Sequence, residues 1–409
     1  MHFLFRVSSI LVGALALPVS GAQKSVGLYE LLGASLNHPS VQLSQNEEIV
    51  SGHRLDAAEW AKYPSFTTDA SAPIGAESSL TLRVEQPIWT GGRVEAGISA
   101  AEKELSVSTI RSREAMDAIQ LEVVEAYTEF WRAQRKYEAS EGNVQRLEEL
   151  VGVITRRVNQ EVSPRTEQVL AEARLQQALS EREQYSGALQ VARSRLLQAT
   201  NISVESVVGL ACELPASVAR EKLVDDVLGS SNRLARLQGE FEVARANIEI
   251  AEAEQWPKLV VGVQSSGVDG FLGRRDTRAY IGFQYQLVDG LSSKSRLFAS
   301  QNALQTVRFE EQVARQQLRQ QVASYFDDYR MAVSQIPALK ALYEANVDLI
   351  DSYRRQYIVG KKSWLDVINA QREVSVAQNL LVDAEVSSCA NALRLQLLSN
   401  DNFVKEERG

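Results

Sequence analysis

Residues 354–374, RRQYIVGKKSWLDVINAQREV, have a counterpart in the first half of the chain, RRVNQEVSPRTEQVLAEARL at residues 156–175. Arg157 matches Arg355 at a spacing of 198 residues. The order of elements also repeats around these stretches: a helical segment that ends at a proline, two short alternating runs, a very long helical segment and a shorter helical return. A period of this length is much longer than a solenoid repeat. The sequence therefore predicts a duplicated half-protein, with one hairpin turn in each half.

The glycine and lysines of the second turn do not match a phosphate-binding loop. Such a loop needs a glycine where this chain has Arg355, and a Ser or Thr where it has Lys362. We expect instead that Gly360 ends the long helix in the left-handed conformation. Ser363 would cap the next helix, and Asp366 would complete a capping box. The stretch therefore predicts a tight turn between two helices.

Composition and motifs exclude several classes of function. The 409 residues carry a net charge of -8, with 52 acidic and 44 basic residues, and no basic stripe favours a nucleic-acid partner. No nucleophile, base and orienting group form a recognisable set. His38 and His53, the histidines beyond the N-terminal segment, lack metal-ligand spacing. We expect no catalysis, no cofactor and no metal.

The N-terminal segment, residues 1–22, has the features of a secretory signal peptide. Arg6 precedes an apolar run, and Ser20 and Ala22 suit the -3 and -1 positions of a cleavage site before Gln23. The run is too short to span a bilayer, and no later stretch has about 18 apolar residues. A membrane-spanning part would therefore have to consist of β-strands.

Two pairs of short runs alternate with the two-residue period of strands. The clearest are SLTLRVEQPIW at residues 79–89 and AYIGFQYQLV at residues 279–288. Their length of about ten residues suits a tilted membrane strand, and Tyr63, Trp89 and Trp256 lie where an interfacial aromatic girdle would be expected. A half-buried soluble sheet fits the strands equally well.

The helical segments favour the membrane alternative. No proline interrupts Val94–Val158, and only Pro337 interrupts Ser292–Gly360, so each segment would be roughly 100 Å long. That length indicates coiled coil rather than a globular core. Near residue 345 two apolar seams run together, which requires a partner on each side, as in a wall of helices closed into a tube. The seams are Leu339, Leu342, Asn346, Leu349 and Tyr353, and Tyr343, Val347, Ile350 and Tyr357. Because four strands cannot close a barrel and open edges are not tolerated in lipid, the chain must oligomerise.

Together these features resemble the TolC-type outer membrane efflux and secretion proteins. The resemblance covers essentially the whole mature chain and includes the strand end EQPIWTGGR at residues 85–93 and the V-G-x-x-S-x-x-D turn. It implies a mainly α fold, in which long antiparallel coiled-coil helices form a periplasmic α-barrel. Four transmembrane β-strands per chain would contribute to the shared twelve-stranded β-barrel of a homotrimer. Cys212 and Cys389 would lie near the belt around the tunnel, as a disulfide or as two free thiols.

The resemblance also divides the chain into segments. They are the signal peptide 1–22, a periplasmic helical segment 23–63, a β-hairpin 64–89, a helical hairpin 90–201, an equatorial segment 202–222, a helical segment 223–257, a second β-hairpin 258–289, a second helical hairpin 290–399 and a C-terminal tail 400–409.

The implied function is that of a channel in the outer membrane with a large periplasmic portion. It would dock through a periplasmic adaptor onto an inner-membrane transporter. The absence of a lipid-anchor cysteine after the cleavage point favours type I secretion of protein from an ABC transporter. Small-molecule or drug efflux with a proton-driven pump is the alternative. A soluble periplasmic coiled-coil adaptor or scaffold is a second one, but it predicts no membrane strands.

The resemblance assigns the tips of the hairpins to the gate and the adaptor. Tyr357 and Lys362 match positions that latch neighbouring helices, and Asp366 matches an acidic ring that narrows the entrance. The second acidic position of the family falls on Asn369, which reduces the charge of the ring. The expected adaptor contacts are Val359, Gly360, Lys361, Ser363, Val162, Ser163 and Pro164.

The first tip departs from the pattern because it has no glycine. Gln160 or Val162 would take the place of the glycine, depending on the gap. Ser163-Pro164 would start the next helix as cap and first-turn proline. The acidic partner of the latch would be Gln168 or Glu167.

Overall fold

The computed structural model describes residues 25–71, 79–210, 212–214, 219–268, 275–285 and 292–399. The expected signal peptide and the C-terminal tail lie outside these residues.

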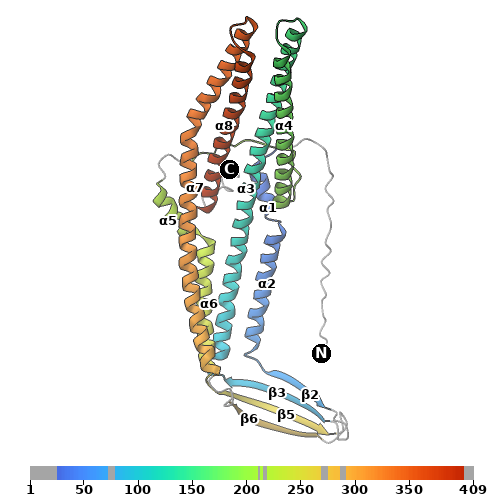
Figure 1. Ribbon diagram of the computed structural model, residues 1–409. Coiled ribbons are helices and arrows are strands. Elements are labelled where there is room, and N and C mark those ends of the chain that lie inside the picture. Colours follow the sequence, from blue (N-terminus) through green and yellow to red (C-terminus); the bar gives the residue numbers. More distant parts are fainter. Residues whose placement is uncertain are drawn as a thin grey trace, which may run out of the picture.

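Two long helical hairpins extend from a small sheet to the opposite end of the molecule (Figure 1). The first hairpin consists of α3 (Arg93–Asn159) and α4 (Arg165–Thr200), and the second of α7 (Ser292–Ile358) and α8 (Trp364–Leu398). α3 and α7 have 67 residues each, which corresponds to a length of about 100 Å. Within the described ranges, no helix is apolar over enough residues to cross a membrane.

Shorter helices complete the wall beside these hairpins. Between the sheet and the middle of the molecule, α2 (Pro39–Trp60) packs on α3, and α6 (Asn232–Ala253) packs between α3 and α7. Towards the tips, α4 packs on α3, α3 packs on α8, and α8 packs on α7. At the middle of the molecule lie α1 (Leu28–Ser35), α5 (Arg220–Ser230) and the short parallel pair β1 (Ser25–Val26) and β4 (Ser206–Val207).

The sheet is antiparallel and has the strand order β2-β3-β5-β6. These strands are β2 (Ser65–Ser71), β3 (Ser79–Trp89), β5 (Lys258–Val268) and β6 (Arg275–Gln284). The register aligns Phe66, Val84, Val263 and Ala279 in one row of an apolar face. Phe66 on this face is 80% exposed, and Ile281 and Phe283 are 74% and 71% exposed. Among the described residues, the outer edges of β2 and β6 have no strand partner.

The opposite face of the sheet is polar and contains a hydrogen bond that leaves no room for a side chain at Gly262. Glu85, Gly262 and Tyr280 align across β3, β5 and β6, and the Tyr280 hydroxyl donates to the Glu85 carboxylate across the middle strand. A Cβ on Gly262 would lie 2.8 Å from the Tyr280 ring. The two-faced character read from the sequence is therefore present in the structure.

The sheet meets the helices at a joint made by two glycines. Gly91 and Gly92 follow β3 with φ angles of +65° and +87°, and Gly92 is the N-cap of α3. Trp89 and Trp256 form an edge-to-face pair here with ring centroids 6.4 Å apart, and Tyr63 packs against Trp60 at 5.2 Å. The predicted girdle residues are thus exposed and close to the junction of sheet and helices.

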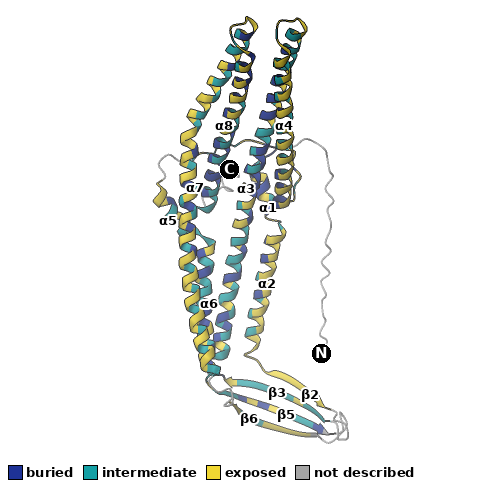
Figure 2. Cartoon of the chain, viewed as in Figure 1, coloured by how far each residue is buried: buried dark blue, intermediate teal, exposed yellow. Residues whose placement is uncertain are grey.

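The long helix α7 is buried on one side only. Figure 2 shows a nearly continuous exposed stripe along α7. Of the two seams expected near residue 345, the one that contains Ile350 and Tyr357 is buried in the cluster near the tips, whereas Leu342 and Leu349 of the other are exposed. A single chain therefore leaves one seam without a partner.

The two halves are related by a spacing of 199 residues, so the spacing of 198 read from the sequence was wrong by one. α3 begins at Arg93 and α7 at Ser292, with equal lengths. Positions that are buried in both halves also recur at 199, for example Val123 with Val322 and Leu196 with Leu395. The identical arginines of the two turns suggested the wrong register. On a helix, an error of one residue rotates a side chain by about 100°.

Candidate functional site

The two tips have the same backbone turn although only one contains glycine. In the second tip, residues 359–363, Gly360 has φ +73°; in the first tip, residues 160–164, Glu161 has φ +58°. Each residue follows the end of its helix in a Schellman arrangement. The hydrogen bonds are Gly360 N to Tyr357 O at 3.0 Å and Lys361 N to Gln356 O at 2.9 Å, and Glu161 N to Val158 O and Val162 N to Arg157 O, both at 2.9 Å. The left-handed residue of the first tip is therefore Glu161, and the expectation of Gln160 or Val162 at this position was wrong.

The second tip starts its return helix with the expected capping box. The Ser363 hydroxyl accepts from Asp366 N at 3.2 Å, and the Asp366 carboxylate accepts from Ser363 N at 3.1 Å. In the first tip, Pro164 rather than Ser163 is the N-cap of α4. Pro164, which the structure describes, makes no side-chain hydrogen bond to the first turn of the helix. The Ser163 side chain instead accepts from Arg157 Nε at 3.3 Å. The expected cap role of Ser163 is therefore wrong.

Tyr357 connects the second hairpin to the first. Its side chain is 5% exposed, and its hydroxyl lies 3.2 Å from the Glu167 carboxylate and 3.3 Å from Ser163 Oγ. The Trp364 ring packs against it at 5.3 Å. Of the two candidate acidic partners, the structure brings Glu167 to Tyr357, whereas Gln168 donates to Glu172 within α4. We call this set, Tyr357, Ser163 and Glu167, the latch.

The electrostatics of the tips keep Tyr357 neutral and Asp366 charged. Burial raises the pKa of Tyr357, with further upward effects from Glu167 and opposing effects from Ser163 and Arg157. The phenol therefore remains a hydrogen-bond donor at neutral pH. The hydrogen bonds from Ser363, and then the charge of Lys362, lower the pKa of Asp366.

Lys362 contacts its own hairpin. Its Nζ lies 4.3 Å from the centre of the Tyr353 ring and 4.0 Å from the Asp366 carboxylate. These contacts do not involve the first hairpin, so within one chain Lys362 is separate from the latch. Asp366 is partly exposed and Asn369 is exposed.

Exposed apolar side chains surround both turns. Val359 is 66% exposed, and Val162, Ile358 and Leu365 are also exposed. Clustered exposed apolar side chains are typical of protein contact surfaces. The sequence reading included Val359 and Val162 but missed Ile358 and Leu365, which occupy ordinary helical positions on either side of the turn.

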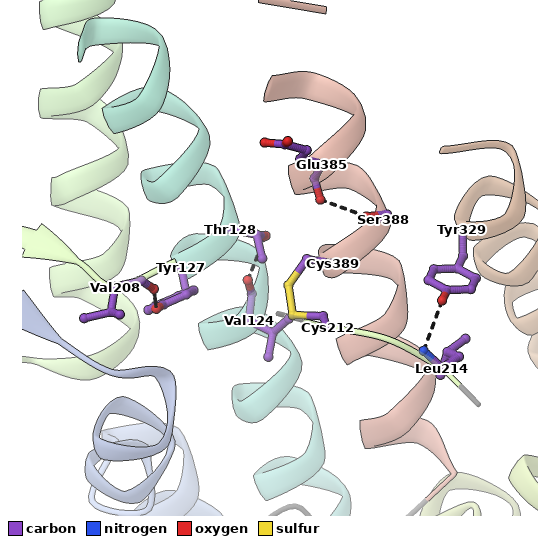
Figure 3. Close-up of a disulfide and its surroundings, with 10 residues drawn as sticks. All are labelled: Val124, Tyr127, Thr128, Val208, Cys212, Leu214, Tyr329, Glu385, Ser388 and Cys389. Atoms are coloured by element: carbon purple, nitrogen blue, oxygen red, sulfur yellow. Dashed lines mark hydrogen bonds between the residues drawn. A yellow bond between two sulfur atoms is a disulfide. The ribbon is translucent and has the colours of Figure 1, made fainter. Parts of the chain in front are cut away.

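A strap at the middle of the molecule, described at residues 206–210 and 212–214, ties the first hairpin to the second (Figure 3). The Tyr127 hydroxyl of α3 donates to Val208 O, and Leu214 N donates to the Tyr329 hydroxyl of α7 at 3.0 Å. Between these points a disulfide joins Cys212 to Cys389 of α8, with a Cα–Cα distance of 4.8 Å. The pairing that the sequence left open is therefore present.

The described residues contain no group of three or more His, Cys, Asp or Glu side chains that could hold a metal ion. The site is thus an arrangement of packing and hydrogen bonds between two helical hairpins.

Comparisons with known proteins agree with this architecture. The sequence model described as outer membrane efflux protein matches residues 32–201 and 223–401. Outer membrane efflux protein BepC from Brucella suis biovar 1 (strain 1330) is 23% identical over 326 residues, which cover 75% of this chain and 68% of that protein.

Solved outer membrane channels have the same fold. The outer membrane protein VceC from Vibrio cholerae has a TM-score of 0.78 and 16% identity, with 91% of this chain and 95% of that chain covered. The open state of the MtrE outer membrane channel from Neisseria gonorrhoeae has a TM-score of 0.74 and 17% identity, with 91% and 88% covered. The mainly helical fold with a small antiparallel sheet, expected from the sequence, is confirmed.

Proposed function

Because the chain belongs to the outer membrane efflux protein family, we propose that it is the channel-tunnel of a tripartite export system, gated at its helical tips. Membership places it in the outer membrane with a large periplasmic helical portion, among channels rather than enzymes. The observation that carries the gate is the latch, since Tyr357 of one hairpin is buried against Ser163 and Glu167 of the other at the end farthest from the sheet.

Three copies would close the barrel and the tunnel. The free edge of β6 in one copy would pair with β2 of the next, which gives twelve strands with their apolar faces towards lipid. The exposed stripe of α7, with Phe298 and Phe309, would pack against the exposed apolar residues of α2, such as Leu43 and Ile49. These faces support the assembly because a monomer would leave them in water.

The partners follow from the family, whose channels work as homotrimers with a periplasmic adaptor and an inner-membrane pump. We place the adaptor at the exposed residues of the tips, and Tyr357, Lys362 and Asp366 at the gate. For the substrate, we favour protein exported by an ABC transporter. Efflux of small molecules by a proton-driven pump is the second candidate, favoured by the description of BepC as an efflux protein.

Single-channel recording of the purified oligomer in planar bilayers tests the gate. The wild-type channel is expected to be mostly closed. Tyr357→Phe keeps the buried ring but removes the hydroxyl donor, so it should raise the open fraction. A wild-type level of opening in this variant would contradict the gate assignment.

A gene deletion separates the two substrates. If the protein serves secretion, the deletion should remove an exported protein from the medium and leave drug susceptibility unchanged. Increased drug susceptibility with an unchanged set of exported proteins would establish efflux instead.

A further inference from the structure

Arg157, near the end of α3, contacts both tips. Its Nε donates to Ser163 Oγ at 3.3 Å, and its Nη1 donates to the carbonyl of Ile358 at 3.4 Å. Its guanidinium carbon lies 4.8 Å from the centre of the Tyr357 ring. We propose that Arg157 is the positioning residue that holds the latch closed, an inference that rests on the gate proposed above.

The backbone of Arg157 fixes the turn that supplies its partner. Its carbonyl accepts from Val162 N at 2.9 Å and from Ser163 N at 3.3 Å. The turn therefore presents Ser163 to the guanidinium of the same residue that closes the turn. One residue thus couples the shape of the first tip to the position of Tyr357.

The hydrogen bonds around Arg157 form a directional chain. Because Ser163 Oγ accepts from Arg157, its own proton is free for the Tyr357 oxygen, and the Tyr357 proton is free for Glu167. Each hydroxyl then accepts once and donates once, from a cation at one end to a carboxylate at the other. Such chains polarise each other, so loss of the first donor weakens the later bonds.

The contact set requires an arginine rather than any cation. Only a planar guanidinium can stack over a ring while two of its N–H groups point to separate acceptors. One acceptor, the Ile358 carbonyl, belongs to the last turn of α7, where carbonyls lack helical partners and the helix dipole favours a positive charge. Lysine would keep the charge but lose the stacking and one directional bond.

The second tip has no such residue at the equivalent position. Gln356 lies 199 residues after Arg157, and its carbonyl closes the turn in the same way. Its side chain, however, donates to Ser352 within α7. The coupling therefore runs from the first tip to the second, and the two tips have different roles although their backbones match.

The test compares open fractions of the full-length oligomer in planar bilayers. Arg157→Gln should lower the closed-to-open ratio about tenfold, the size expected for loss of one cation–π contact and two side-chain hydrogen bonds. The closed-to-open ratio of Arg157→Lys should lie between those of Arg157→Gln and wild type. Arg156→Gln, at the exposed neighbouring position, is the matched control and should behave as wild type.

A double variant distinguishes a latch role from a general loss of stability. Arg157→Gln combined with Tyr357→Phe should open the channel less than the sum of the two single effects, because both changes break the same hydrogen-bond chain. Additive opening, or a wild-type ratio in both Arg157 variants while Tyr357→Phe opens the channel, would overturn the role of Arg157 and leave the gate standing. If Tyr357→Phe also had no effect, the gate itself would be refuted. If the glutamine variant does not assemble, the lysine variant decides.

Discussion

At the residue scale, Glu161 shows how a turn is retained without its usual glycine. A non-glycine residue in the left-handed region is strained by about 1 kcal/mol. The first tip tolerates this strain because its Schellman bonds and the Arg157 contacts fix the turn. The sequence could not identify Glu161 directly, since the arginines common to both turns suggested a register one residue away.

Glu161→Gly should therefore raise the stability of the first tip by about 1 kcal/mol, because it removes the left-handed strain. Gly360→Ala should cost about the same, since φ is +73° there but a Cβ meets no atom within 4 Å. Thermal melts of the helical circular dichroism signal measure both. Equal melting temperatures for Glu161→Gly and wild type would contradict the strain argument.

Gly360→Val adds β-branching and should impair export with the oligomer intact.

Asp366 has two roles in our proposal, as a helix cap and as part of an acidic ring. Three copies at a narrow entrance would attract divalent cations. Asp366→Ala should weaken block by divalent cations in bilayer recordings. Ser363→Ala is the control, because it breaks the same capping box without removing the charge. Equal block in both variants and wild type would exclude a ring role.

The pH dependence of the cap follows from the lowered pKa of Asp366. A carboxylate whose pKa is lower in the folded state stabilises the fold at pH values above its unfolded pKa of 3.8, and this contribution disappears as the pH falls through the lower folded value. The capping box should therefore be unaffected between about pH 5 and 8. Comparison of Asp366→Asn with wild type in melts at neutral and acidic pH measures this. The difference between their melting temperatures should shrink only in strong acid.

At the scale of elements, the helices and the turn at Gly360 were predictable, and the contacts between segments distant in the sequence were not. Long segments with heptad seams and at most one proline specify long helices, and alternation specifies two-faced strands, because both patterns are local. The strap and its disulfide depend on contacts between residues 177 positions apart, which no local pattern contains. The same reason explains why the contacts of Arg157 were not expected from the sequence: its partners lie on the other hairpin or across the turn.

The joint between sheet and helices should be the most sensitive point of the backbone. A Cβ on Gly91 would lie 2.6 Å from the Trp256 Cβ, in addition to the strain of a positive φ. Gly91→Ala should cost roughly 2 kcal/mol or more and reduce the yield of assembled oligomer. Gly92→Ala has the same kind of strain but meets no atom within 4 Å, so it should cost about 1 kcal/mol. Similar yields and melting temperatures for the two variants would contradict the steric argument.

The strap disulfide should contribute to stability by restricting the unfolded chain. Removal of a native disulfide typically costs about 2–4 kcal/mol. Cys212→Ser with Cys389→Ser should lower the melting temperature, and a reductant should lower that of the wild type but not of the double variant. A double variant that melts as the oxidised wild type would show that the hydrogen bonds to Tyr127 and Tyr329 are sufficient to hold the strap.

At the scale of the whole molecule, a single chain leaves strand edges unpaired and apolar faces exposed. Its sheet has two free edges, its apolar strand face is exposed, and α7 has an exposed seam along its length. Each feature would be satisfied by another copy or by lipid, and none by further folding of the described chain. Assembly and insertion are therefore expected to be coupled.

The exposed stripe of α7 gives a direct test of that assembly. Phe309→Glu places a charge where the neighbouring copy would bury a ring, so it should abolish the heat-modifiable oligomer in outer membrane fractions. Phe309→Leu keeps the face apolar and should assemble as wild type. Normal assembly of the glutamate variant would remove this stripe from the interface. Release of the wild-type protein by osmotic shock without detergent would refute the channel and favour a soluble periplasmic scaffold.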